Sequence, residues 1–248
     1  MQTHKQQFLC LKSWAPIRAG ASSKMEMTSS LLFGETCTLL SKEADWFEVR
    51  CNEDHYLGWI PALYLEDATS YLGLKWNIVD EIGARLIGKQ GDEILLSPGS
   101  LIPDAKELEI HGSVYHFHPG KKLPEKSYEI AQCFLNTPYL WGGRTFWGID
   151  CSGLIQVVGK LLNVSMPRDA HEQATMGIKK MWSQIAIGDL AYFSNTNAKV
   201  VHVGIYIGNG RILHAHGHVR IDTLSAQGIE NAITGKLTHI LCDIRSWQ

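Results

Sequence analysis

The stretch "YLWGGRTFWGIDCSGLIQVV", from Tyr139 to Val158, places a cysteine between a glycine-rich turn and an apolar run. Apolar residues at helical spacing predict a helix that begins at Cys151 and ends near Asn163. The first N–H groups of a helix lack partners and carry partial positive charge. We therefore expect them to favour the thiolate of Cys151 and to hold an oxyanion, as a nucleophilic cysteine requires.

A cysteine nucleophile also needs a base, and a group that orients this base. His202 begins "HVGIYIG", a predicted strand in which Gly204 shares the face of His202 and leaves room for a partner. Across the "GNG" turn, His214 is expected on the neighbouring strand, where it can orient the imidazole of His202. Cys151, His202 and His214 are therefore the candidate catalytic residues.

The histidines at positions 214, 216 and 218 allow a second interpretation, a metal site. All three would lie on one face of a single strand, which suits a metal poorly without further ligands. The Cys–His chemistry needs neither a metal nor a cofactor, and we expect none.

Composition narrows the class of protein. The chain has 248 residues, 45% of them hydrophobic, and a net charge of −2, which does not indicate a nucleic-acid partner. Its six cysteines form no CxxC pair, so we expect free thiols, and inert buried ones at Cys10, Cys37 and Cys51. We expect no membrane span and no signal peptide, hence a cytoplasmic location, or a periplasmic or secreted one if a leader was removed.

Three segments differ in pattern. Residues 1–68 and 69–122 show short alternating runs broken by turns, which predicts two small β modules, the second one degenerate. Residues 123–248 read as helices followed by an antiparallel sheet, so the fold class of this part is α+β. The oligomeric state is not readable from the sequence, and a monomer is the default.

From about residue 125 to 248, the chain resembles the NlpC/p60 family of cysteine peptidases, which act on bacterial cell-wall peptides. The resemblance rests on the stretch quoted above and on "MPRDAHEQA", "IAIGDLAYFS" and "HVGIYIGNGRILHA". It implies a papain-like fold, with Cys151 as nucleophile, His202 as base and His214 as the orienting residue.

The stretches "KMEMTSSLLFGETCTLL" and "ADWFEVRCNEDHYLGWIPALYL" of the N-terminal segment resemble the bacterial SH3-like (SH3b) modules that precede the peptidase domain in one subgroup. That subgroup consists of γ-D-glutamyl-L-diamino acid endopeptidases, also called dipeptidyl-peptidase VI. The resemblance implies a murein peptide as substrate, cut between γ-D-Glu and the diamino acid when the N-terminal L-Ala is free.

The resemblance also implies substrate contacts. Asp150 and Ser152 would contact the amino end and D-Glu, and two aromatic residues, Tyr139 and Trp141, would line the same pocket. Glu26 and Tyr56 of the SH3-like module would close the pocket over the free amine. The carboxylate of Glu26 would form a charge-assisted pair with the ammonium group of the substrate.

Structural roles compete with these assignments. Asp150 could cap the helix, Glu26 could be solvated and Tyr56 could belong to the barrel core. Arg168 and Asp169 are expected to form a local pair. Two other functions stay open for the whole chain: a non-catalytic murein-binding protein, and a papain-like amidase or acyltransferase acting on another substrate.

Overall fold

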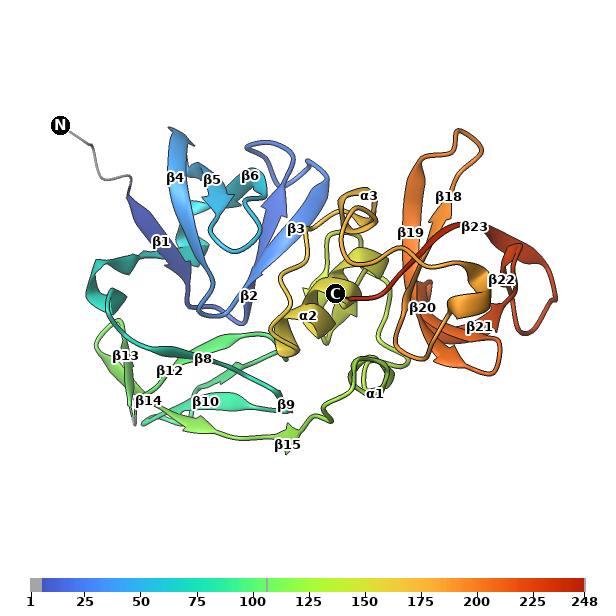
Figure 1. Ribbon diagram of the computed structural model, residues 1–248. Helices are drawn as coiled ribbons and strands as arrows, with labels where there is room; N and C mark the ends of the chain where they lie inside the picture. Colours follow the sequence, from blue (N-terminus) through green and yellow to red (C-terminus); the bar gives the residue numbers. More distant parts are fainter. Residues whose placement is uncertain (1–5, 106, 248) are drawn as a thin grey trace. The chain divides into compact units, whose positions relative to one another are not determined.

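The computed structural model describes residues 6–105 and 107–247. The chain divides into two compact units, Met1–Leu123 and Pro124–Gln248 (Figure 1). Each unit has its own sheets and buried core, and the two are described in turn.

The first part of the N-terminal unit is a strongly bent antiparallel sheet with strand order β3-β2-β6-β5-β4-β1-β7. Its strands are β1 (Gln7–Cys10), β2 (Trp14–Arg18), β3 (Met27–Leu32), β4 (Thr36–Glu43), β5 (Trp46–Cys51), β6 (Leu57–Pro61) and β7 (Leu65–Asp67). Alternating residues of these strands bury one core, which contains Cys10, Cys37 and Cys51. These three thiols are buried, as predicted.

The second part of the N-terminal unit begins after two short 3₁₀ turns, Ala62–Tyr64 and Ala68–Tyr71. Its main sheet has the order β11-β10-β14-β13, and two further pairs, β12–β8 and β15–β9, flank it. The strands are β8 (Trp76–Ile78), β9 (Glu81–Ile82), β10 (Arg85–Gly88), β11 (Glu93–Leu95), β12 (Leu101–Pro103), β13 (Leu108–Ile110), β14 (Ser113–His118) and β15 (Lys121–Lys122).

The two β parts of this unit share a second hydrophobic core. Leu9, Leu11 and Phe33 from the first part pack with Leu86 and Leu96 from the second. A Cβ on Gly34 would lie 2.3 Å from the carbonyl oxygen of Leu101, so the close approach of the two parts requires glycine here. The second module is therefore packed onto the first rather than joined to it by a loose linker.

The C-terminal unit places its helices before a closed barrel of strands. The helices are α1 (Ser127–Gln132), α2 (Cys151–Leu161) and α3 (Ala170–Gln173), with a 3₁₀ turn at Trp182–Gln184 and a short hairpin of β16 (Arg144–Thr145) and β17 (Gly148–Ile149). The barrel follows the order β18 (Leu190–Ser194), β19 (Val200–Gly208), β20 (Arg211–His216), β21 (His218–Leu224), β22 (Gly228–Glu230) and β23 (Leu237–Arg245).

The helix α2 packs beside β19 of this barrel (Figure 1). Its residues 151–159 are all buried, including the polar Gln156, whose side-chain amide donates to the Met166 carbonyl at 3.0 Å. The helix ends near Asn163, which takes a positive φ of 59°. The α2 prediction is therefore confirmed in position, but the helix is enclosed on every side rather than apolar along one face.

Two strands of the barrel were not predicted. The segments of β21 and β22 carry polar residues at many positions, and only three residues make up β22. They close the predicted antiparallel sheet into a barrel. In the C-terminal unit the helices are segregated from the barrel strands, as in an α+β fold, but strands dominate both units.

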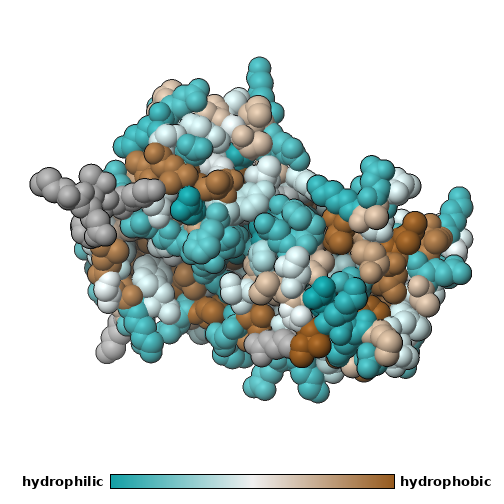
Figure 2. All heavy atoms as spheres, turned by 45° about the horizontal axis from the view of Figure 1, so that its top comes forward, coloured by the Kyte–Doolittle hydropathy of each residue, from teal (hydrophilic) through white to brown (hydrophobic). Residues whose placement is uncertain are grey.

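Hydrophilic and hydrophobic side chains alternate over the face shown in Figure 2. Across residues 6–105 and 107–247, we find no helix with the length and apolar character needed to cross a membrane.

Candidate active site

Cys151 is the first residue of α2, and 6% of its surface is exposed. The helix that it begins packs against β19, the strand that carries His202, and the backbone N–H of Val203 on this strand acts on the thiol to lower its pKa. A tight glycine turn precedes the helix: a Cβ on Gly153 would lie 2.2 Å from the carbonyl oxygen of Gly143. The cysteine therefore meets the barrel where the turn brings the start of α2 against β19.

The electrostatics of Cys151 differ from the sequence-based expectation. Burial, with the carboxylate of Asp150 next to it, raises the pKa of the Cys151 thiol to about 12. The N–H of Val203, the N–H of Ser152 and the charge of Arg168 act in the opposite direction but are outweighed. The expected resting thiolate is therefore wrong, because desolvation exceeds the stabilisation that the helix N-terminus provides.

His202 and His214 are brought together as predicted. Both side chains are buried, on β19 and β20, and Nε2 of His202 lies 2.8 Å from Nδ1 of His214. Gly204 is the direct cross-strand partner of His214, and a Cβ there would lie 2.9 Å from the His214 Cβ. The glycine beside the histidines therefore makes the space that His214 occupies.

Asp222 continues this chain of hydrogen bonds and was not predicted. Its Oδ2 lies 3.0 Å from Nε2 of His214, and 2% of the residue is exposed. His214 pairs in register with Arg220, so Asp222 occupies the diagonal position two residues further along β21. A second hairpin, with its turn at Gly217, pairs the strand of His214 with the strand of Asp222. Predicting this hairpin from the sequence would have identified Asp222.

Asp150 acts as the N-cap of α2 and holds the loop around it. Its carboxylate accepts hydrogen bonds from the N–H groups of Gly153 at 2.7 Å and Gly142 at 2.8 Å. Both of its oxygens also pair with the guanidinium of Arg168, and both side chains are buried. The predicted pair between Arg168 and Asp169 is therefore wrong: Arg168 reaches back across the fold to the residue before Cys151.

Ser152 belongs to the same buried network. Its hydroxyl accepts from Nη1 of Arg168 at 2.8 Å and lies 3.4 Å from Oδ1 of Asp150. Its backbone carbonyl accepts from the side-chain amide of Gln173 at 3.0 Å. Asp150 and Ser152 thus flank Cys151 on the helix side of the site, with their orientations fixed by Arg168.

A cleft of about 390 Å³ opens on the other side of the site, next to His202. Its lining residues come from the loop before β16 and from barrel strands, and they are Tyr139, Val201, His202, Ala215, His216, Gly217 and His239. Burial and the nearby Cys151 and Asp150 raise the pKa of Tyr139, so its phenol is protonated. Trp141 is 56% exposed.

His239 on β23 stacks on His202, with the ring centroids 4.2 Å apart. Burial, together with the neighbouring His214 and His216, lowers the pKa of His239 to about 4. Burial and these histidines likewise hold the pKa of His202 well below its ordinary value. Both imidazoles are therefore neutral at pH 7, as a general base requires.

The alternative metal site at positions 214, 216 and 218 is not assembled. His216 and His218 face each other as a cross-strand pair on β20 and β21, while His214 bonds to His202 and Asp222. Over the described part of the chain, no cluster of His, Cys, Asp and Glu side chains is arranged to hold a metal ion.

Glu26 and Tyr56 lie in the N-terminal unit. Glu26 is exposed in the loop between β2 and β3, and Tyr56 is half-buried against the barrel core. Arg18, the last residue of β2, pairs with Trp59 of β6 in antiparallel register. The loop that carries Glu26 therefore begins beside the start of β6, which directly follows Tyr56. Both residues therefore lie at one end of the same barrel.

Comparison with protein families identifies both parts of the chain. Residues 136–238 match the NlpC/P60 family, and residues 17–63 match the bacterial dipeptidyl-peptidase SH3 domain. A solved structure of an NlpC/P60 family protein from Bacillus cereus has a TM-score of 0.79 and 20% identity, covering 97% of this chain and 99% of that one. The fold is therefore papain-like with an N-terminal SH3 domain.

Two curated relatives extend the comparison. The γ-D-glutamyl-L-lysine dipeptidyl-peptidase of Bacillus subtilis is 28% identical over 222 residues, which is 80% of this chain and 75% of that protein. The probable endopeptidase NlpC of Escherichia coli is 35% identical over 105 residues, or 39% of this chain and 68% of that protein. With a cysteine at the start of a buried helix, a histidine-bearing barrel and these relatives, the chain belongs to the NlpC/P60 family and is a hydrolase of the cysteine peptidase type.

Proposed function

We propose that the protein hydrolyses the bond between γ-D-Glu and the diamino acid in murein peptides whose N-terminal L-Ala is free. One observation carries the chemistry: Cys151 begins the helix that packs against β19, and His202 on this strand has its Nε2 held by His214. This bond leaves Nδ1 of His202 as the nitrogen that can take the Cys151 proton. The names of the dipeptidyl-peptidase relatives support the choice of bond.

Attack on the substrate begins from a neutral pair, because the pKa of Cys151 is raised and that of His202 is lowered. As the sulfur adds to the γ-carbonyl carbon of D-Glu, Nδ1 of His202 takes the thiol proton. The N–H groups at the start of α2 stabilise the oxyanion that forms. The helix terminus thus acts on the transition state rather than on a resting thiolate.

Collapse of this intermediate breaks the C–N bond, and His202 gives its proton to the leaving amine of the diamino acid. A thioester between Cys151 and D-Glu remains. His202 then takes a proton from water as the water oxygen attacks the thioester carbon, and returns it to the sulfur as the C–S bond breaks. L-Ala-γ-D-Glu is released and both catalytic residues regain their starting states.

The requirement for a free amine is assigned to Glu26 and Tyr56, which share one end of the SH3-like barrel. A carboxylate paired with the L-Ala ammonium contributes a charge-assisted hydrogen bond. An acetylated N-terminus removes that positive charge and leaves the carboxylate desolvated without a partner, which is costly. Asp150 and Ser152, with Tyr139 and Trp141, would contact the rest of the dipeptide.

The test is product analysis by mass spectrometry with L-Ala-γ-D-Glu-L-Lys-D-Ala and its N-acetylated form. Cleavage after D-Glu in the free peptide alone supports the whole proposal. Cleavage of both keeps the peptidase chemistry and removes the amine pocket. Cleavage of neither contradicts the proposed function and favours a binding protein or another acyl substrate.

The amine pocket has its own test in Glu26→Gln. We expect this variant to lose most of its preference for the free peptide over the acetylated one. Glu43→Gln, at an exposed glutamate on β4 of the same barrel, is the matched control and should retain the preference. Equal preference in both variants would remove Glu26 from the site.

A further inference from the structure

The Asp222 carboxylate is enclosed by hydrogen-bond donors. Its Oδ1 accepts from Nη2 of Arg220 at 2.8 Å and from the N–H of Ala232 at 2.8 Å, while Oδ2 faces Nε2 of His214 at 3.0 Å. Burial alone would raise the pKa of Asp222, but these bonds outweigh it and hold the pKa well below its ordinary value. The group is therefore an ionised carboxylate, which can only accept hydrogen bonds.

The position of each proton in the chain of histidines follows from this acceptor. Since Asp222 only accepts, Nε2 of His214 must carry the hydrogen of their bond. A neutral imidazole carries one N–H, so Nδ1 of His214 is an acceptor. His202 lies 2.8 Å away through its Nε2, which must then be the N–H donor. Nδ1 of His202 is left with its lone pair, ready to take the thiol proton.

We propose that Asp222 is a positioning residue that sets, through His214, which nitrogen of His202 acts as the base. This inference rests on the proposed function and adds a carboxylate, two hydrogen bonds away from the base, to the Cys–His–His arrangement. Asp222 touches neither the base nor the nucleophile, and it acts by fixing the tautomers of both histidines.

An isosteric substitution reverses the predicted proton positions. In Asp222→Asn, the amide oxygen must face Arg220 and the N–H of Ala232, because both are obligatory donors. The amide NH₂ group then faces His214 and turns its Nε2 into an acceptor. His214 must donate from Nδ1, so His202 must accept at Nε2 and carry its hydrogen on Nδ1. The base is then protonated on the nitrogen that should receive the Cys151 proton.

The experiment combines kinetics with ¹⁵N NMR of the histidine ring nitrogens. We expect Asp222→Asn to lower kcat/KM on L-Ala-γ-D-Glu-L-Lys-D-Ala by about 10²–10⁴-fold, the scale known for a wrong tautomer in a hydrolase triad. The matched control is Asp243→Asn on β23, where the carboxylate likewise accepts from an arginine, Arg245, and from a backbone N–H. The kcat/KM of the control variant should stay within about threefold of the wild-type value.

The NMR readout distinguishes tautomer control from a merely structural role. In the wild type, His202 and His214 should both be protonated on Nε2, and in Asp222→Asn both should be protonated on Nδ1. A wild-type His202 protonated on Nδ1 would overturn the proposal, even if the variant does not fold. So would an Asp222→Asn variant as active as the Asp243→Asn control. If the wild type fails to cleave the peptide, the proposed function fails and the wild-type tautomers still decide this inference.

Discussion

The guanidinium of Arg168 pairs with both carboxylate oxygens of Asp150, the residue directly before Cys151. Both side chains are buried, and the same guanidinium also donates to the hydroxyl of Ser152. One arginine, 18 positions away from Asp150 in the sequence, therefore fixes the cap of α2 and the residues on either side of Cys151.

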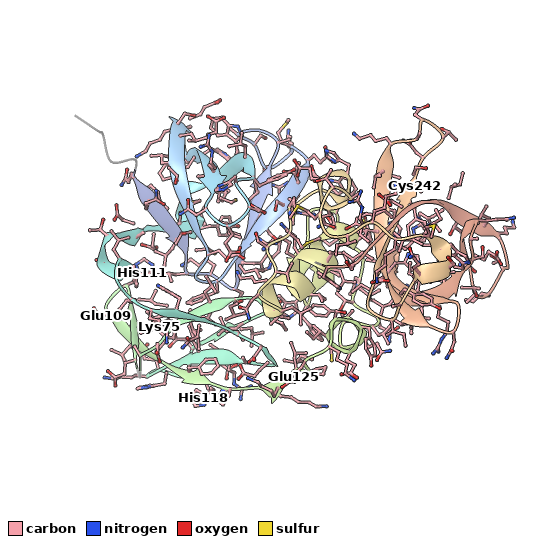
Figure 3. All side chains as sticks on the ribbon, viewed as in Figure 1. Lys75, Glu109, His111, His118, Glu125 and Cys242 are labelled. Atoms are coloured by element: carbon pink, nitrogen blue, oxygen red, sulfur yellow. The ribbon has the colours of Figure 1, made fainter. Side chains whose placement is uncertain are left out.

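Removing this arginine should destabilise the C-terminal unit. Arg168→Met leaves the Asp150 carboxylate buried without its charge partner, and we expect a loss of about 3–5 kcal/mol in the free energy of unfolding. Denaturant titration followed by tryptophan fluorescence measures the change. The control is Lys75→Met, at the exposed Lys75–Asp104 pair of the N-terminal unit (Figure 3), where little change is expected. Equal effects in the two variants would contradict the structural role of Arg168.

Gly204→Ala should break the hydrogen bond between His202 and His214. The new Cβ would lie 2.9 Å from the His214 Cβ and 2.8 Å from Cδ1 of Ile212. The His214 Cβ is held by the strand backbone, and the Ile212 side chain is fully buried. We expect a loss of kcat of about 10²-fold or more, because His214 moves off Nε2 of His202. Gly20→Ala is the control, since its Cβ would meet only the flexible, exposed side chain of Met25, at 3.2 Å. Full activity of Gly204→Ala would contradict this account of His214.

The dependence of kcat/KM on pH should have an acid limb and no alkaline limb in the moderate range. His202 must be neutral to act as a base, and burial holds its pKa below the ordinary value, so activity should rise through a midpoint below about 6.5 and then level off. The Cys151 thiol, with its pKa of about 12, stays protonated throughout. An alkaline loss of activity with a midpoint below about pH 9 would indicate a resting thiolate–imidazolium pair instead.

The side chain of His239 should affect the midpoint pH of the acid limb of kcat/KM. His239→Phe keeps a flat ring stacked on His202 but removes an imidazole whose positive charge, at low pH, opposes protonation of His202. His214 and His216 exert the same effect from β20 and remain in the variant. The midpoint of the acid limb should therefore move to higher pH, as measured from kcat/KM profiles of both proteins. A shift to lower pH would show that His239 stabilises the charged base.

The same lowered pKa values predict acid sensitivity of the fold. His202, His214 and His239 bind protons less readily when folded than when unfolded, because all three are desolvated. The unfolded state takes up more protons as pH falls below about 6.5, so stability should decrease there and be fully present above it. Thermal unfolding of the C-terminal unit between pH 7.5 and about pH 5 tests this. A melting temperature that rises on acidification would contradict it.

The sequence was sufficient for the parts of the site that depend on local pattern. Cys151 at a helix start follows from the glycine turn and the apolar run, and the pairing of His202 with His214 follows from a hairpin of known turn type. These relations span few residues, so helical and strand periodicity determines them.

Relations that need the whole fold were missed or misjudged. Arg168 forms its ion pair with Asp150 and not with its neighbour Asp169, because the loop before α3 returns to the start of α2. The periodicity of the sequence does not reveal this return. Asp222 lies on β21, whose polar residues obscure the strand pattern, so only the pairing with β20 beyond His214 reveals it. The thiol of Cys151 is protonated because burial, a property of the packed unit, outweighs the local helix effect.

The most direct test of the account is the activity of three proteins on L-Ala-γ-D-Glu-L-Lys-D-Ala: wild type, Cys151→Ala and Cys242→Ala. Cys242 is an exposed thiol on β23 (Figure 3), and its removal controls for loss of a cysteine. We predict release of L-Ala-γ-D-Glu by the wild type and by Cys242→Ala, and none by Cys151→Ala. Undiminished release by Cys151→Ala would contradict the assignment of Cys151 as the nucleophile.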